Sequence, residues 1–271
     1  MRKPTIVAMG GGGFSMEPEN PLLDDYVLSL VSPPPGPAAR DLVEESRADA
    51  CREVRAFASP ALPGKALPRV CFVPTASGDA EGYVERFRAA FAARAEASVL
   101  DLFRRSVADL EAFLLSQEVI YVGGGNTANM LAVWRVHGVD RILRAAWERG
   151  VVLCGLSAGS LCWFEGGVTD SFGALASLHD GLGLLPGSHC PHYDGEPERK
   201  PTYERFVRDG MLKGGWAADD GVALHFEGTE LVGAVASRPS AMAWRVERSV
   251  AGELAVRALR PRYLGAEAAA S

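Results

Sequence analysis

The amino-acid sequence predicts an α/β fold in which a doubly wound, mostly parallel sheet is flanked by helices and has an antiparallel C-terminal edge. Two features of the chain carry this prediction. From residue 70 onward, short apolar runs alternate with stretches of helical periodicity, as in successive βαβ units. Beyond residue 221, short strand-like segments joined by tight turns indicate antiparallel pairing.

The predicted strands and helices follow one another regularly. A first strand at 5–9 runs into the glycine turn 10–13. The alternating region contains predicted strands at 70–73, 98–103, 119–122 and 151–154, and predicted helices at 81–96, 107–116, 126–136 and 139–149. Residues 165–171 have the composition of a turn, and 184–194 that of a short apolar stretch entering a polar loop. The antiparallel edge is expected at 222–226, 231–235 and 242–247.

The chain is long enough for one large domain. Its 271 residues are 48% hydrophobic, which favours a single domain spanning 1–271. A proline-rich run at 33–37 interrupts the pattern, and further prolines follow up to Pro68. We therefore expect a surface insertion at about 32–69, in which an apolar helix face is a candidate subunit contact of a homo-oligomer.

Composition excludes several classes of partner. With 28 Lys and Arg against 34 Asp and Glu, the net charge is −6 and no strongly basic block occurs, so nucleic acid is not an expected partner. No apolar run approaches the roughly twenty residues of a membrane span, and Met1 to Pro4 lead directly into a strand, which favours a cytoplasmic protein. The five cysteines form no C-x-x-C pair, so neither a disulfide nor a zinc site is indicated. No cofactor is expected, because the glycine turn 10–13 lacks the acidic residue that completes a dinucleotide fingerprint.

Ser157 is the candidate nucleophile. The apolar strand ends in Gly155-Leu156-Ser157-Ala158-Gly159, a Gly-x-Ser-x-Gly pattern typical of a strand, a sharp turn and a helix. Such a turn exposes the serine Oγ and directs the Ala158 N–H towards a developing oxyanion. The alternative interpretation is a tight turn in which small residues serve packing alone.

A second glycine turn is the candidate for the other half of an oxyanion hole. The predicted turns at the carboxyl ends of the strands are small and polar, as a common cleft requires. Among them, the run from Gly123 to Gly125 allows backbone N–H groups to face a ligand, so Gly124 or Gly125 is expected to donate to the oxyanion. Asn126 either caps the next helix or contacts substrate.

A serine nucleophile needs a histidine base and a carboxylate that orients it. His192 follows a short apolar stretch in a loop able to overhang Ser157, and is preferred over His179 and His189. The alternative is that His192 is merely solvated. For the carboxylate, Asp170 in the turn-like segment after the serine competes with Asp220 and, more weakly, with Glu165. The residues alone leave this choice open.

The ordered set of motifs resembles peptidase E, the aspartyl dipeptidase family of peptidase S51. The matching stretches are Gly10–Gly13, Pro74–Ser77, Gly123–Thr127, Gly155–Gly159 and Cys190–Tyr193. The resemblance implies a class I glutamine amidotransferase-like fold with serine in place of cysteine. It further implies a Ser-His-acid triad that hydrolyses dipeptides with N-terminal aspartate. By motif, Ser157, His192 and Asp170 carry over as the triad, and the related cyanophycinase family suggests Asp220 instead.

Selectivity for an aspartate side chain requires a cation. Arg199, shortly after His192, resembles the family's substrate arginine, although a solvated charge at a helix start is the alternative. Two other functions stay open: a cyanophycinase-like or other-specificity serine peptidase, and a catalytically silent binding protein of the same fold. In each peptidase interpretation the partner is a small peptide.

Overall fold

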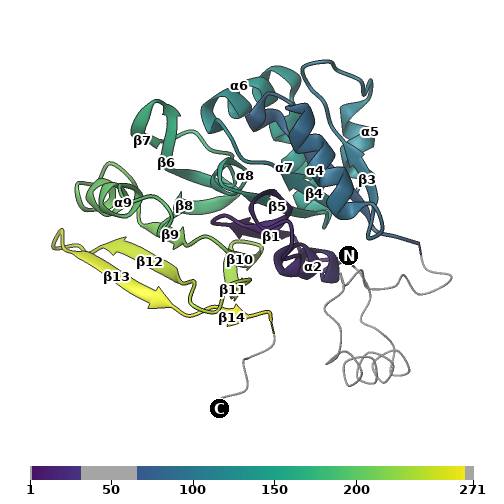
Figure 1. Ribbon diagram of the computed structural model, residues 1–271. Coiled ribbons are helices and arrows are strands. Elements are labelled where there is room, and N and C mark those ends of the chain that lie inside the picture. Colours follow the sequence, from purple (N-terminus) through teal and green to yellow (C-terminus); the bar gives the residue numbers. More distant parts are fainter. Residues whose placement is uncertain (1, 32–65, 266–271) are drawn as a thin grey trace, which may run out of the picture.

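The computed structural model describes residues 2–31 and 66–265, and shows two sheets with helices packed on them (Figure 1). The first is an eight-stranded sheet of order β14-β11-β10-β1-β5-β4-β2-β3. Its strands are β1 (Thr5–Met9), β2 (Arg69–Val73), β3 (Glu96–Val99), β4 (Val119–Val122), β5 (Val152–Leu156), β10 (Val222–Glu227), β11 (Glu230–Ala236) and β14 (Arg262–Tyr263).

The centre of this sheet is parallel, and its C-terminal side is antiparallel. Strand β1 pairs in parallel with β5 and antiparallel with β10, and β5, β4, β2 and β3 are all parallel to one another. Every residue of β1, β4 and β5 is buried, as expected for strands covered on both faces. The mixed α/β fold with its antiparallel edge is therefore confirmed.

Helices cover both faces of the first sheet, which makes it doubly wound. Along β1, Ile6 and Ala8 face one core and Val7 and Met9 face the other, because successive strand residues point to opposite sides. The Ile6 face packs against α5 (Leu110–Leu115), α6 (Thr127–His137) and α7 (Val139–Glu148). The Val7 face packs against α1 (Gly13–Met16), α2 (Leu22–Ser29) and α4 (Glu81–Phe91).

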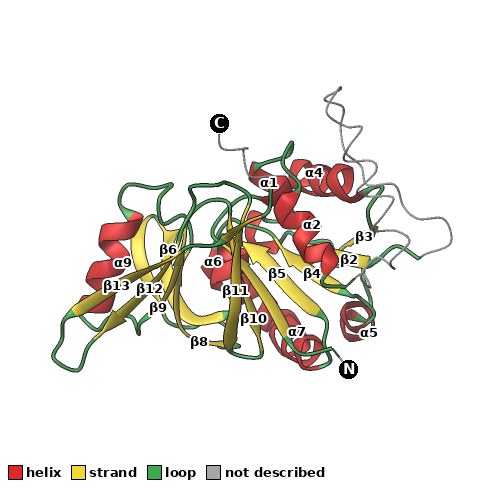
Figure 2. Cartoon of the chain, turned by 90° about the horizontal axis from the view of Figure 1, so that it is seen from below, coloured by secondary structure: helices red, strands yellow, loops and turns green. Residues whose placement is uncertain are grey.

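A second sheet lies beside the first, and the sequence did not predict it (Figure 2). Its order is β13-β12-β9-β8-β6-β7, and its outer side carries α9 (Arg199–Arg208). The strands are β6 (Phe164–Phe172), β7 (Ala174–Leu178), β8 (Leu185–Cys190), β9 (Gly215–Ala218), β12 (Ala243–Arg248) and β13 (Leu254–Leu259). The third strand expected at the edge of the first sheet, 242–247, is thus β12 of the second sheet.

The expectation of a turn at 165–171 is wrong, because this segment lies within β6. Gly166 and Gly167, which suggested the turn, are there for close strand packing: a Cβ would collide with the Leu178 carbonyl at Gly166 and with the His189 carbonyl at Gly167. The strand expected at 98–103 is also shorter and earlier, since β3 ends at Val99.

Part of the predicted organisation lies outside the described residues. Of the insertion expected at 32–69, only 66–69 are described, and Arg69 already belongs to β2. Among the helices that the structure describes, none has the length and apolar character needed to cross a membrane.

Candidate active site

Ser157 occupies the sharp turn between β5 and the short helix α8 (Ala158–Leu161). Its backbone has φ 55° and ψ −117°, a left-handed conformation that costs a residue with a side chain about 1–3 kcal/mol. The flanking glycines make this turn possible. A Cβ on Gly155 would collide with the carbonyls of Gly159 and Val122, and a Cβ on Gly159 would collide with that of Val122. The predicted strand, turn and helix are therefore formed.

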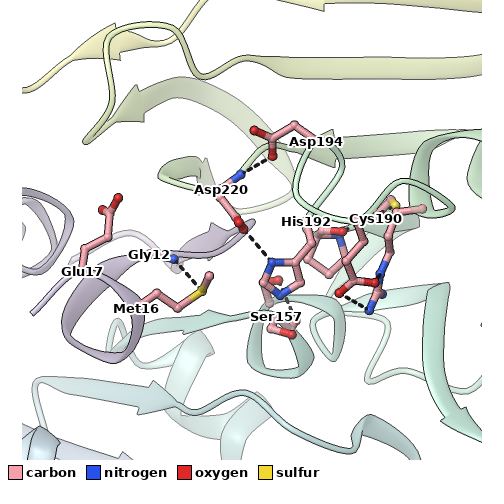
Figure 3. A network of polar contacts seen from close by, with 12 residues as sticks. Gly12, Met16, Glu17, Ser157, Cys190, His192, Asp194 and Asp220 are labelled. Atoms are coloured by element: carbon pink, nitrogen blue, oxygen red, sulfur yellow. Dashed lines mark hydrogen bonds and ion pairs between the residues drawn. The ribbon is translucent and has the colours of Figure 1, made fainter. Parts of the chain in front are cut away.

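Ser157 and His192 are anchored to successive residues at the end of β1. The Ser157 N–H donates to the Met9 carbonyl at 3.2 Å, and the His192 N–H donates to the Gly10 carbonyl at 3.3 Å. Figure 3 shows the His192 ring beside Ser157. His192 follows β8 and also has a positive φ, 54°. The structure thus brings together the two residues that the sequence singled out as nucleophile and base.

The carboxylate that meets His192 is Asp220. Its Oδ1 lies 2.6 Å from His192 Nδ1, and both side chains are 13% exposed (Figure 3). Burial alone would raise the pKa of this carboxyl. The hydrogen bond and charge of His192, together with the charges of Arg238 and Arg199, lower that pKa below its usual value. Asp220 is therefore ionised at neutral pH, and its Oδ1 accepts the proton on His192 Nδ1.

The glycine turn 10–13 lies directly under this pair. A Cβ on Gly11 would collide with Asp220 Oδ1 and come within 3.0 Å of the His192 ring. Asp220 is held in place from the other side, because its N–H donates to Asp194 Oδ1 at 2.8 Å. Asp194 is a residue that the sequence analysis missed. No motif marks it, because its contact with Asp220 arises only from the loop after His192.

The expectation that Asp170 contacts His192 is wrong. Asp170 lies in β6, its side chain is 58% exposed, and its Oδ2 is 3.7 Å from Arg199 Nη2. The segment 164–172 is an extended strand and not a turn that folds back, and Asp220 takes the place beside His192. Glu165, the third candidate, instead accepts from Lys213 Nζ at 2.9 Å and from the Gly187 N–H at 2.7 Å.

The second glycine turn lies against the nucleophile, as expected of an oxyanion hole. A Cβ on Gly124 would approach Ser157 Cβ to 3.3 Å. The Gly124 N–H, however, donates to the Tyr83 hydroxyl at 3.1 Å, so this donor is already engaged. The Gly125 N–H has no acceptor among the described residues, and Ala158 is the first residue of α8, whose N–H has no acceptor within the helix.

The two residues expected to contact substrate are both engaged within the protein. Asn126 Oδ1 accepts the Asn129 N–H at 2.9 Å and caps α6, while Nδ2 donates to the Ser171 carbonyl at 2.9 Å. Arg199 is only 4% exposed. Its Nε and Nη2 donate to Glu196 at 2.7 and 3.1 Å, and Nη1 donates to the Val168 carbonyl at 3.3 Å.

Comparison with known proteins shows the family to which the chain belongs. The chain matches Peptidase family S51 over residues 52–233, and it belongs to that family. It is 46% identical to the "Uncharacterized peptidase YgaJ" of Bacillus subtilis over 261 residues, which cover 96% of this chain and 99% of that protein. The family resemblance inferred from the motifs is confirmed, and the chain is a peptidase.

Two more distant relatives extend the comparison. "Peptidase E" of Citrobacter koseri is 33% identical over 112 residues, covering 40% of this chain and 49% of that protein. A crystal structure of a peptidase from an acI-B1 Actinobacterium superimposes with a TM-score of 0.61 at 16% identity, covering 96% of this chain and 95% of that chain. At this identity the second likeness supports the fold alone.

Proposed function

We propose that the chain is a serine peptidase in which Ser157 is the nucleophile, His192 the base and Asp220 the orienting acid. The observation that carries this proposal is the 2.6 Å contact between His192 Nδ1 and Asp220 Oδ1. It forms where Ser157 and His192 are bonded to Met9, the last residue of β1, and to the adjacent Gly10. Asp170, the acid that the resemblance to peptidase E implied, has no part in the proposed triad.

The proposed reaction proceeds through an acyl-enzyme. Ser157 Oγ attacks the scissile carbonyl carbon while His192 Nε2 takes its proton, and the ionised Asp220 stabilises the imidazolium that forms. The oxyanion accepts hydrogen bonds from the N–H groups of Ala158 and Gly125. His192 then protonates the leaving amine as the C–N bond breaks. Water, deprotonated by the same nitrogen, attacks the acyl carbon, and His192 returns the proton to Ser157 Oγ as the ester C–O bond breaks and the acid leaves.

For the substrate, we propose dipeptides with N-terminal aspartate, the specificity implied by the resemblance to peptidase E. Arg199 is the cation available to meet the aspartate side chain. Its guanidinium now holds the Glu196 carboxylate by two hydrogen bonds, in the bidentate geometry that a substrate carboxylate would adopt. Glu196 is 46% exposed, so it has room to leave when an anionic substrate competes for Arg199.

A second candidate is a serine peptidase with the same triad and another specificity. The closed Arg199–Glu196 pair favours it, because a buried guanidinium that already binds an internal carboxylate through two of its N–H groups gives little selectivity for an acidic residue. In that case Arg199 holds α9 against β6 and does not touch substrate.

Hydrolysis of a dipeptide panel by the wild-type chain and by Ser157→Ala separates these candidates. Cleavage confined to Asp-X peptides and abolished in Ser157→Ala supports the proposal. Cleavage of other dipeptides, also abolished by the substitution, supports the second candidate. If no dipeptide is cleaved and a serine-reactive phosphonate does not label Ser157, the proposal is overturned. The chain would then be interpreted as a binding protein that keeps the fold.

A further inference from the structure

A buried chain of hydrogen bonds lies behind the nucleophile turn. It is formed by Ser160 on α8 and His189 on β8, and both side chains are completely buried. Ser160 Oγ lies 2.8 Å from the Ser157 carbonyl oxygen and 3.1 Å from His189 Nε2. His189 Nδ1 lies 3.0 Å from the Trp216 carbonyl oxygen on β9. The peptidase reaction proposed above assigns no role to either side chain.

The partners of His189 determine where its proton sits. A carbonyl oxygen only accepts, so the proton is on Nδ1 and is donated to Trp216. Burial lowers the pKa of His189 to about 3, so the ring is neutral and Nε2 carries a lone pair. The Ser160 hydroxyl has a single proton, which it shares between this lone pair and the Ser157 carbonyl oxygen in a three-centre hydrogen bond. Without it, Nε2 would be a buried acceptor with no partner, which is unfavourable.

The position of His189 is itself fixed on several sides. It pairs with Gly167 of β6 and with Trp216 of β9, and its ring stacks on Phe164 with centroids 4.7 Å apart. The hydroxyl of Ser160 is thereby held at a fixed place above the Ser157 carbonyl. Three residues further along the same strand and loop comes His192, the proposed base.

We propose that Ser160 and His189 are positioning residues that hold the strained Ser157 turn in register with His192. The inference rests on the proposed function, since it concerns the orientation of the nucleophile. In this proposal the second sheet contributes to the reaction in two ways. The base, His192, follows the end of β8, and His189 on β8 fixes the turn that holds Ser157 at the end of β5.

The test is the rate at which a serine-reactive fluorophosphonate labels Ser157 in the folded full chain. Ser160→Ala removes the hydroxyl and leaves His189 Nε2 without a donor. We expect labelling and the kcat for dipeptide hydrolysis to fall by about ten- to a hundredfold, as small misplacements of a reacting group do. KM is expected to stay within about twofold, because neither side chain faces the substrate.

The matched control is Ser188→Ala. Ser188 is a buried serine on β8, next to His189, and its hydroxyl contacts Tyr203 and the Lys213 carbonyl on the side of α9. The Ser188→Ala variant loses a comparable number of hydrogen bonds, so it serves as the control for general destabilisation. Its labelling rate is expected to match that of the wild type. Ser160→Thr, which restores the hydroxyl, is expected to recover most of the lost rate.

The outcomes are distinct. Equal labelling of Ser160→Ala and Ser188→Ala, with wild type labelled normally, overturns the positioning role and leaves the proposed function intact. A wild-type chain that is not labelled at all overturns the proposed function and the positioning role with it. Should Ser160→Ala not fold, Ser160→Cys keeps the volume with a weaker donor. Severalfold slower labelling of that variant supports the role, and a wild-type rate overturns it.

Discussion

His192 Nδ1 and Asp220 Oδ1 are 2.6 Å apart, although the two residues come from different sheets. His192 follows β8 of the second sheet, while Asp220 precedes β10 of the first. They meet because β9 leads from the second sheet back to the first, next to the glycine turn after β1. The contact therefore depends on how the two sheets are joined, and it is the basis for assigning Asp220 as the acid.

Replacing Asp220 tests this assignment against the rival acid. Asp220→Asn keeps the shape but removes the charge that orients and stabilises the imidazolium of His192. We expect kcat to fall by about a hundred- to ten-thousandfold. Asp170→Asn is the matched control, since Asp170 is exposed and lies beside Arg199. Steady-state hydrolysis measures both, and a larger loss from Asp170→Asn would contradict the assignment.

The pair formed by Arg199 and Glu196 predicts a gain of affinity. Glu196→Ala removes the internal carboxylate from the guanidinium, which is then free to bind an aspartate side chain. We expect KM for Asp-X dipeptides to fall severalfold while KM for dipeptides with a neutral first residue is unchanged. If both substrate classes respond alike, Arg199 is not the specificity residue and the second candidate function is favoured.

Gly125 is predicted to be essential to the oxyanion turn. Its φ is 137°, and a Cβ there would collide with the Ala76 carbonyl. Gly125→Ala is expected to displace the turn from Ser157 and to reduce kcat at least tenfold. The control is Gly228→Ala, at a positive φ of 57° where a Cβ meets nothing within 4 Å. That variant is expected to cost only about 1 kcal/mol of stability and no activity. Unchanged kcat in Gly125→Ala would remove Gly125 from the site.

Asp24 on α2 predicts a pH dependence of stability. Burial raises the pKa of this carboxyl to about 7, and its Oδ1 accepts from the Tyr121 hydroxyl at 3.1 Å. Because the folded pKa lies above the unfolded value, Asp24 supports the fold fully at low pH. That support is lost as the pH rises towards 7.

The variant Asp24→Asn isolates this effect, since an amide stays neutral at every pH. Relative to wild type, it is expected to gain stability between pH 4 and pH 8, by up to about 4 kcal/mol. Thermal or denaturant unfolding of both proteins across this range measures the difference. A stability difference that does not change with pH would show that the buried carboxyl is not neutralised by folding.

Local sequence patterns predicted the parts of the site that depend on local structure. The turn around Ser157 depends on Gly155 and Gly159, which lie two residues before and two residues after the serine. The sequence therefore predicted this turn directly. His192 is distinguished from the other histidines by its place in a loop just after an apolar stretch. Asp220 could not be chosen over Asp170 from spacing, because the choice depends on whether 164–172 is a turn or a strand. The glycines that suggested a turn there serve strand packing instead.

The sequence could not predict the partners of Gly124 and Asn126, because Tyr83 and Ser171 reach them through tertiary packing and form no motif with them. Glu196 is a local partner, three residues before Arg199, but its spacing alone does not say whether the arginine binds it or a substrate. The second sheet was missed because several of its strands lack a continuous apolar run: β6 contains two glycines, β8 contains a proline and a glycine, and β12 and β13 contain charged residues. Their apolar patterns are therefore weaker than those of β1, β4 and β5.

The most direct test of the account is mass-spectrometric mapping of the adduct formed with a serine-reactive fluorophosphonate, in wild type and in His192→Ala. The account predicts a single adduct on Ser157 in the wild-type chain, and labelling slowed by about a hundredfold or more when the base is removed. An adduct on another serine, or labelling of Ser157 that does not depend on His192, would contradict it.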